Sequence, residues 1–295
     1  MTQAITGRRR GLDAIDAAAR RLAAVGVESA WLDAELLMAA AAGVTRAEIL
    51  AGGLSLSSET LARFDAMLSR REKREPLAYI LGHKEFYSLD FEVSPAVLIP
   101  RPETELAVAA ALEAIKSTRD PRILDIGTGS GAIAIAIAAN AHDALVTATD
   151  ISADALAIAV RNASRHRVAD RVTFRHADCF EVLDGEPRLE RFDLIVSNPP
   201  YIDDGSIAAL EPEVRGFEPR VALGAGADGL NFFRRIAAGT RAHLQDAGEA
   251  IVEVGSGQAA AVSDIFERAG LRVASVLNDL AGHPRVVRAR AVGVK

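Results

Sequence analysis

The spacing of hydrophobic residues divides this chain into a helical first part and a longer part in which strands and helices alternate. In the first part, apolar residues recur at helical intervals. A β-hairpin pattern follows, with arms at residues 83–87 and 89–93. From Arg122 onward strands and helices alternate, which is typical of a parallel sheet. The sequence therefore predicts a helical domain, a hairpin linker and an α/β domain, at residues 1–75, 76–100 and 101–295.

Seven segments of the α/β domain have the apolar character of buried strands. The last two are joined by a short connection without a helix, so we expect them to be antiparallel neighbours. The expected fold is α/β, with a Rossmann-like sheet of seven strands that is mostly parallel and has one antiparallel strand. The predicted strands are 122–126, 144–150, 172–177, 192–197, 248–255, 271–276 and 285–292.

A glycine-rich turn follows the first of these strands. Glycines let the backbone turn tightly and let a ligand approach closely, and the helix start after them presents free N–H groups. The same glycines satisfy the dinucleotide fingerprint, so they do not by themselves separate a nicotinamide cofactor from S-adenosylmethionine. Asp125 favours the second, because an acid there can pair with the amino end of a methionine moiety but would repel a pyrophosphate. The candidate cofactor contacts are Asp125, Gly127, Thr128, Gly129, Ser130 and Gly131.

Acidic residues also follow the next two strands. Asp150 can accept hydrogen bonds from ribose hydroxyls, and its alternative role is to cap the helix that starts near Ser152. Asp178 can accept from the exocyclic amine of adenine, and Cys179 can line the adenine ring. An ordinary turn is an equally good interpretation of these last two residues.

The tetrapeptide Asn198-Pro199-Pro200-Tyr201 follows the apolar run 192–197. Open α/β sheets bind ligands at the carboxyl ends of their strands. Asn198 offers a carbonyl acceptor, the two prolines lack N–H groups and leave their carbonyls free, and Tyr201 offers a flat face. Asn-Pro and Pro-Pro dipeptides usually mark turns. Here the strand before them and the glycine turn upstream favour a site that holds a planar NH2 group, so that another group can be transferred onto its nitrogen.

Together these motifs resemble class I S-adenosylmethionine-dependent methyltransferases and, more narrowly, the release factor glutamine methyltransferase (PrmC/HemK) family. The likeness covers nearly the whole chain. Two positions depart from the family: it usually has Asp where this chain has Glu103, and it often has Trp where this chain has Cys179. Further segments similar to the family are 76–82, 85–87, 98–105, 218–223, 228–230, 280–282 and 285–288.

The resemblance implies a methyltransferase fold that uses S-adenosylmethionine and releases S-adenosylhomocysteine. The methyl acceptor would be the side-chain amide nitrogen of the glutamine in the Gly-Gly-Gln loop of class 1 peptide chain release factors. Asn198 and the Pro199 carbonyl would each accept one amide N–H, Tyr201 would pack on the amide plane, and Pro200 would complete the substrate contacts. Asn198 would also contact the cofactor, and the helical domain would dock the release factor.

Composition indicates the cellular compartment of the protein and the kinds of partner it binds. A single cysteine in 295 residues excludes an internal disulfide and agrees with the reducing cytoplasm. The cysteine and histidines lack zinc spacing, so we expect no metal. We see no stretch that could cross a membrane. The net charge of −6 argues against binding to a nucleic-acid backbone. We expect a cytoplasmic monomer without a membrane or direct nucleic-acid partner.

Four other functions share some of these motifs. A glutamine methyltransferase that acts on a ribosomal protein would have nearly the same core, and the helical domain would be the discriminating feature. An adenine-amino DNA methyltransferase can hold a flipped-out amine with the same acceptors. A NAD-dependent oxidoreductase would use the same glycines but leaves Asn-Pro-Pro-Tyr unexplained. A non-catalytic adaptor is opposed by the intact acceptor set.

Overall fold

The structure is a computed structural model that describes residues 2–51, 56–181 and 191–291, and the chain divides into two compact units. Unit 1 contains the chain up to Gly82 together with Glu211–Phe217. Unit 2 contains His83–Leu210 and the chain from Glu218 onward. The chain therefore leaves unit 1, returns to it for one short segment, and leaves it again.

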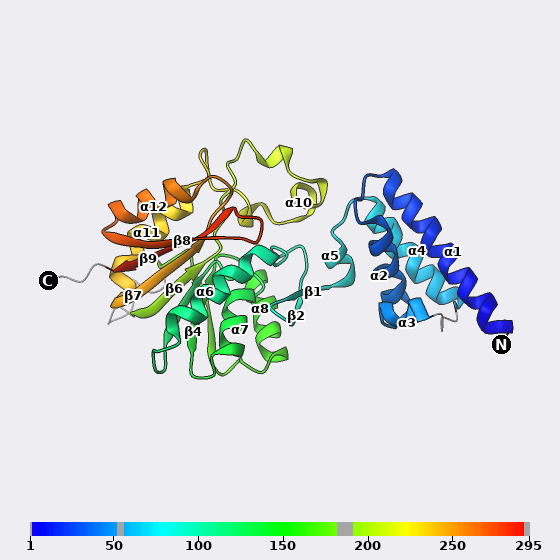
Figure 1. The fold of residues 1–295 in the computed structure, drawn as a ribbon, viewed down its shortest axis with the longest axis horizontal. Helices are drawn as coiled ribbons and strands as arrows, with labels where there is room; N and C mark the ends of the chain where they lie inside the picture. Colours follow the sequence, from blue (N-terminus) through cyan, green and yellow to red (C-terminus); the bar gives the residue numbers. More distant parts are fainter. Residues whose placement is uncertain (1, 52–55, 182–190, 292–295) are drawn as a thin grey trace. The chain divides into compact units, whose positions relative to one another are not determined.

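Unit 1 is built from helices, as the sequence predicts (Figure 1). Large side chains that include Ile15, Leu22, Leu37 and Phe64 are buried in its core. The first residues of the predicted linker form a helix of their own, α5, and the hairpin begins only after it. The helices before the hairpin are α1 (Thr2–Ala24), α2 (Ala30–Ala42), α3 (Arg46–Ala51), α4 (Ser58–Glu72) and α5 (Leu77–Leu81).

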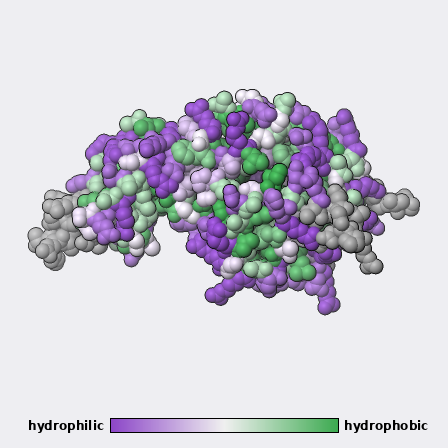
Figure 2. Space-filling model, turned by 180° about the vertical axis from the view of Figure 1, so that it is seen from behind, coloured by the Kyte–Doolittle hydropathy of each residue, from purple (hydrophilic) through white to green (hydrophobic). Residues whose placement is uncertain are grey.

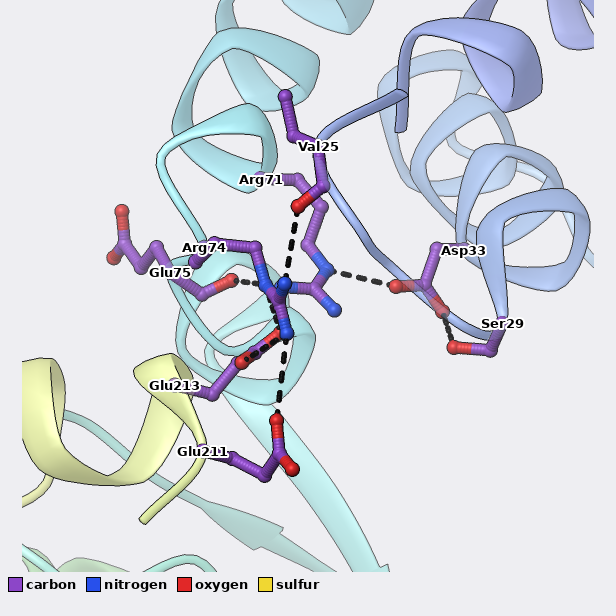
Figure 3. Close-up of polar contacts among 8 residues, drawn as sticks. All are labelled: Val25, Ser29, Asp33, Arg71, Arg74, Glu75, Glu211 and Glu213. Atoms are coloured by element: carbon purple, nitrogen blue, oxygen red, sulfur yellow. Dashed lines mark hydrogen bonds and ion pairs between the residues drawn. The ribbon is translucent and has the colours of Figure 1, made fainter. Parts of the chain in front are cut away.

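Helix α10 (Pro212–Phe217) is the segment that returns to unit 1. Its Glu213 accepts hydrogen bonds from Arg71 of α4 at 2.9 Å and from Arg74 at 2.7 Å (Figure 3). Arg71 is buried and also donates to Asp33 of α2 at 2.7 Å. Breaking a buried ion pair leaves a charge uncompensated. These contacts therefore hold α10 against the helices of unit 1.

Unit 2 contains the hairpin and a seven-stranded sheet. The sheet order is β5-β4-β3-β6-β7-β9-β8, and only β9 runs against its neighbours. This confirms the predicted sheet and its antiparallel last pair, although Val292 lies outside the described residues. The hairpin strands are β1 (His83–Phe86) and β2 (Leu89–Glu92); those of the sheet are β3 (Arg122–Ile126), β4 (Leu145–Asp150), β5 (Val172–His176), β6 (Phe192–Ser197), β7 (Leu244–Glu253), β8 (Leu271–Asn278) and β9 (Pro284–Ala291).

Helices cover both faces of this sheet (Figure 1). Successive strand residues point to opposite faces, so Ile123 joins a core with α6 and α7 whereas Leu124 joins a core with α11 and α12. Burial on both faces explains why the central strands are almost wholly apolar. The covering helices are α6 (Glu105–Ile115), α7 (Ala132–Asn140) and α8 (Ala153–Arg165) on one face, and α11 (Asn231–His243) and α12 (Ala259–Arg268) on the other. Three 3-10 turns complete the described elements: η1 (Pro102–Thr104), η2 (Ile207–Ala209) and η3 (Arg220–Ala222).

The surface drawn in Figure 2 is largely hydrophilic, with hydrophobic residues in smaller areas between. None of the helices in the described part of the chain has both the length and the apolar character needed to cross a bilayer. Within the same residues, no three His, Cys, Asp or Glu side chains gather as metal ligands would.

Asn162 of α8 connects the hairpin and the glycine turn to the helical layer. Its side chain is buried, accepts from the Glu92 N–H at 2.8 Å, and donates to the Glu92 carbonyl at 3.0 Å. It also donates to the Ser130 carbonyl at 2.9 Å. One amide group thus satisfies backbone groups of two separate segments.

We expect Asn162→Ala to lower the free energy of unfolding by about 3 kcal/mol, because it leaves buried backbone groups without partners. Urea unfolding measures this change. Asn140→Ala is the matched control, since Asn140 is exposed and donates only within its own helix; it should stay within about 0.5 kcal/mol of the wild type. Equal stability of the two variants would contradict the linking role.

Candidate active site

Three neighbouring parallel strands end at one place on the sheet. Ile126 of β3 is level with Thr149 of β4 and with Ser197 of β6. The residues that follow therefore emerge at the same edge, and Gly127, Asp150 and Asn198 all line one pocket of unit 2. This is where open α/β sheets bind their ligands.

The glycine turn forms one wall of this pocket. Gly127 and Gly129 line it with φ of +72° and +57°, and a Cβ at either position would meet no atom within 4 Å. Both positions need glycine because of their backbone conformation, and the space in front of them is open to a ligand. Gly131 also has a positive φ, of +83°, and in addition a Cβ there would lie 2.7 Å from Ile135 Cδ1. It permits close packing of the helix that follows.

Asp125 lies beneath the turn and is fully buried. Its Oδ2 accepts from the Thr128 hydroxyl at 2.6 Å and from the Ala134 N–H at 3.2 Å. Its Oδ1 has no hydrogen-bond partner among the described residues. Burial is the main cause that raises the pKa of this carboxyl to about 7; the hydrogen bonds from Thr128 and Ala134 oppose the rise, and the charge of Asp150 adds to it. In the structure Asp125 and Thr128 support the turn from behind, and their contact with a cofactor stays a prediction.

Asp150 lines the pocket and also organises the turn. Its Oδ2 accepts from the Gly129 N–H at 2.8 Å, and its Oδ1 accepts from the Ser152 N–H at 2.9 Å. Burial raises the pKa of the carboxyl, while these N–H donors lower it. The alternative role as helix cap is taken by Ser152, whose hydroxyl accepts from the Ala155 N–H at 3.2 Å.

Asp178 and Cys179 also line this pocket. Asp178 forms an ion pair of 2.8 Å with Arg235 of α11, which also lines the pocket. Cys179 is buried with a φ of +55°, and burial raises the pKa of its thiol to about 11. At neutral pH it therefore presents an uncharged, weakly polar surface.

Sequence reasoning missed the contribution of α11. Phe232, Arg235 and Ile236 all face the pocket. Their spacing of three and four residues is the signal of one helix face, but it does not indicate whether that face meets a pocket or a core. The segment 96–98, just after the hairpin, also lines the pocket and was not predicted to do so.

The residues Asn198, Pro199 and Pro200 close the pocket at the end of β6. The Asn198 Nδ2 donates to the Thr104 hydroxyl at 2.9 Å, a partner that sequence reasoning did not identify. Ser130 lies apart from them, buried behind the turn, where its carbonyl accepts from Asn162.

Tyr201 is held by the turn that follows β7. Its carbonyl accepts from Gln258 Nε2 at 2.8 Å. A Cβ on Gly255 would lie only 2.9 Å from the tyrosine ring, so glycine at that position leaves room for it. Burial raises the pKa of Tyr201 to about 12, and the ring therefore stays a neutral phenol.

Two family models match this chain, and several known proteins are similar to it. The family model described as "PrmC N-terminal domain" matches residues 13–82, and the one described as "Methyltransferase small domain" matches residues 102–211. The release factor glutamine methyltransferase of Cereibacter sphaeroides is 44% identical over 95% of this chain and 98% of its own. That of Geobacter sulfurreducens is 45% identical over 91% of this chain and 92% of its own.

Two solved structures are also similar. The release factor-specific protein-(glutamine-N5) methyltransferase of Alicyclobacillus acidocaldarius is 32% identical, with 68% of this chain and 99% of that chain covered and a TM-score of 0.40. The hMettl16 catalytic domain is 17% identical, with 82% and 85% covered and a TM-score of 0.54. The second likeness shows a shared fold.

From the burial of Asp125 we can predict how the free energy of unfolding depends on pH. In the folded chain its pKa is about 7, whereas the unfolded carboxyl has its ordinary pKa of 3.8. Between these values the folded state keeps a proton that the unfolded state has lost, so stability falls as the pH rises from about 4 to about 7. Asp125→Asn removes this contribution and should reduce the fall.

Urea midpoints at about pH 5 and pH 7.5 measure the effect. The matched control is Asp143→Asn at an exposed position, which should keep the wild-type fall. A fall of wild-type size in Asp125→Asn would show that this carboxyl does not carry the pH dependence.

Proposed function

This chain belongs to the release factor glutamine methyltransferase family, and we propose that it methylates the side-chain amide nitrogen of the glutamine in the Gly-Gly-Gln motif of class 1 peptide chain release factors. The observation that supports this most directly is the common edge of β3, β4 and β6. At this edge the open glycine turn, the Asp150 carboxylate and the residues Asn198 and Pro199 line one pocket.

The pocket residues suit S-adenosylmethionine. The open space before Gly127 and Gly129 admits the methionine part, Asp150 can accept from the ribose hydroxyls, and the uncharged Cys179 can lie against the adenine. The Asp178 carboxylate can accept from the adenine amine while paired with Arg235. When bound, S-adenosylmethionine supplies an electrophilic methyl group, whose C–S bond breaks with its electron pair going to sulfur.

The chain's own residues aim the acceptor nitrogen. The Asn198 Oδ1 and the Pro199 carbonyl each accept one N–H of the substrate amide, and Tyr201 packs on the amide plane. These bonds turn the nitrogen lone pair toward the methyl group and favour the positive charge that grows on nitrogen. Positioning alone can supply ~7–11 kcal/mol of a bimolecular barrier.

No strong general base is needed for this transfer. The nitrogen forms its new bond to carbon with its own electron pair and becomes acidic once it is alkylated. One of its two protons then leaves to solvent, and the product is the N-methyl amide. We propose that the helices of unit 1 dock the release factor, and that the enzyme is a cytoplasmic monomer.

The direct test is incubation with radiolabelled S-adenosylmethionine and purified release factor. We expect label in the release factor and none in a variant whose Gly-Gly-Gln glutamine is replaced by alanine. Ribosomal proteins and DNA serve as parallel acceptors, and label confined to either would replace the proposed substrate.

Asn198→Ala should fold normally but lose about 100-fold or more in turnover, the scale seen when a preorganised hydrogen-bonding group is removed.

Asp150 should contribute to cofactor affinity. We expect Asp150→Asn to weaken S-adenosylmethionine binding by roughly 10- to 100-fold, because hydrogen bonds to a charged group are worth ~1.5–3 kcal/mol. The asparagine oxygen can still accept from Gly129, so the turn is kept. Calorimetry measures the affinity, with the exposed Asp154→Asn as matched control. Unchanged affinity would reject the ribose contact.

A further inference from the structure

Thr104 and Glu253 are two buried polar residues that lie behind Asn198. Neither has a part in the roles described above. Thr104 is 4% exposed and Glu253 is 2% exposed. They come from different elements, since Thr104 ends the turn η1 and Glu253 ends the strand β7. A buried polar group is costly unless it is hydrogen-bonded, so their partners indicate what they do.

Thr104 stands at the N-cap of α6, but its side chain does not cap that helix. Its hydroxyl accepts instead from the Asn198 Nδ2 at 2.9 Å and hydrogen-bonds to the Glu253 carboxyl. Threonine often caps the start of a helix, but Thr104 lies instead between Asn198 of the pocket and Glu253 of the neighbouring strand.

Glu253 lies beside Asn198 because of the sheet register. Val252 of β7 is level with Ser197 of β6, so the next residue of each strand emerges side by side. The Glu253 Oε2 is buried and has no hydrogen-bond partner among the residues that the structure describes. An acid kept there despite this cost requires an explanation beyond stability.

The three groups form a hydrogen-bonded chain with a defined direction. An ionised carboxylate can only accept, so it takes the hydroxyl proton of Thr104. The hydroxyl oxygen is then left with lone pairs on the side of Asn198, where only the NH2 end of the amide can face it. The carbonyl end of Asn198 must therefore point the other way, toward the pocket.

We propose that Glu253 and Thr104 are positioning residues that hold the Asn198 amide with its oxygen toward the substrate nitrogen. The proposal rests on the proposed function, because that orientation matters only if Asn198 must accept a substrate N–H. A flipped Asn198 would present NH2 to NH2 and would repel the substrate amide.

The charge state of Glu253 decides the direction of this chain. Burial raises its pKa to about 7; Glu103 also raises it, while Arg285, Arg101 and the Thr104 hydrogen bond lower it. Both arginines are engaged by other acids, Arg101 by Glu218 and Arg285 by Asp279. The phenol of Tyr201 also faces Glu253 and stays neutral.

Protonation would reverse the chain. A neutral Glu253 can donate to the Thr104 oxygen, and the Thr104 hydrogen is then free to donate to the carbonyl of Asn198. Turnover should therefore fall as the pH drops through about 7, where Glu253 gains its proton. The fall should appear in kcat, because this orientation aims the acceptor nitrogen at the methyl group.

The test measures kcat and KM for release factor methylation from pH 6 to pH 8.5. Thr104→Val removes the hydroxyl at constant shape, and it should lower kcat at pH 8 by about 10- to 100-fold, as small misplacements of reacting groups do. Thr104→Ser keeps the hydroxyl and should retain most of the turnover. Glu253→Gln should also lower kcat at pH 8 and lose the rise of kcat around pH 7, without loss of stability at pH 8.

The matched control is Glu249→Gln, which removes another buried carboxylate of the same strand, one that pairs with Arg288 and Arg290. It should lower stability but keep the kcat and pH profile of the wild type. Wild-type kcat in Thr104→Val, or an unchanged pH profile in Glu253→Gln, would overturn the positioning role while the proposed function stands. A wild-type enzyme that fails to methylate the release factor would overturn the proposed function and the positioning role with it.

Discussion

The parallel register of β3 with β4 and β6 is the constraint on which the rest of the site depends. Hydrogen bonding places Ile126 level with both Thr149 and Ser197. A shift of one residue in either pair would turn every side chain of that strand to the opposite face. The apolar residues on both faces hold the register, so the cores that stabilise unit 2 also align its pocket.

Buried carboxyls support the pocket from behind. Asp125 holds the glycine turn, and Glu253 faces the hydroxyl that orients Asn198; each keeps one oxygen without a hydrogen-bond partner in the described part of the chain. Burial raises both pKa values to about 7. Stability lost in this way is typical of functional sites, where groups are held in place at the expense of the fold.

The loop after Tyr201 links the chemistry to the helical unit through the chain itself. Its middle, α10, belongs to unit 1 through the pairing of Glu213 with Arg71 and Arg74, while Pro219 lines the pocket of unit 2. The two units are thus connected at three points of the chain.

Local patterns in the sequence were enough to predict the sheet, the glycine turn and the place of Asn198 after β6, because strand periodicity and the backbone needs of glycine and proline act over a few residues. They were not enough to show that Asp125 faces inward, that α10 joins the helical unit, or that Thr104 and Glu253 meet Asn198. Those contacts join residues far apart in the chain. Only the packing of strands and helices decides which distant polar groups share a buried space.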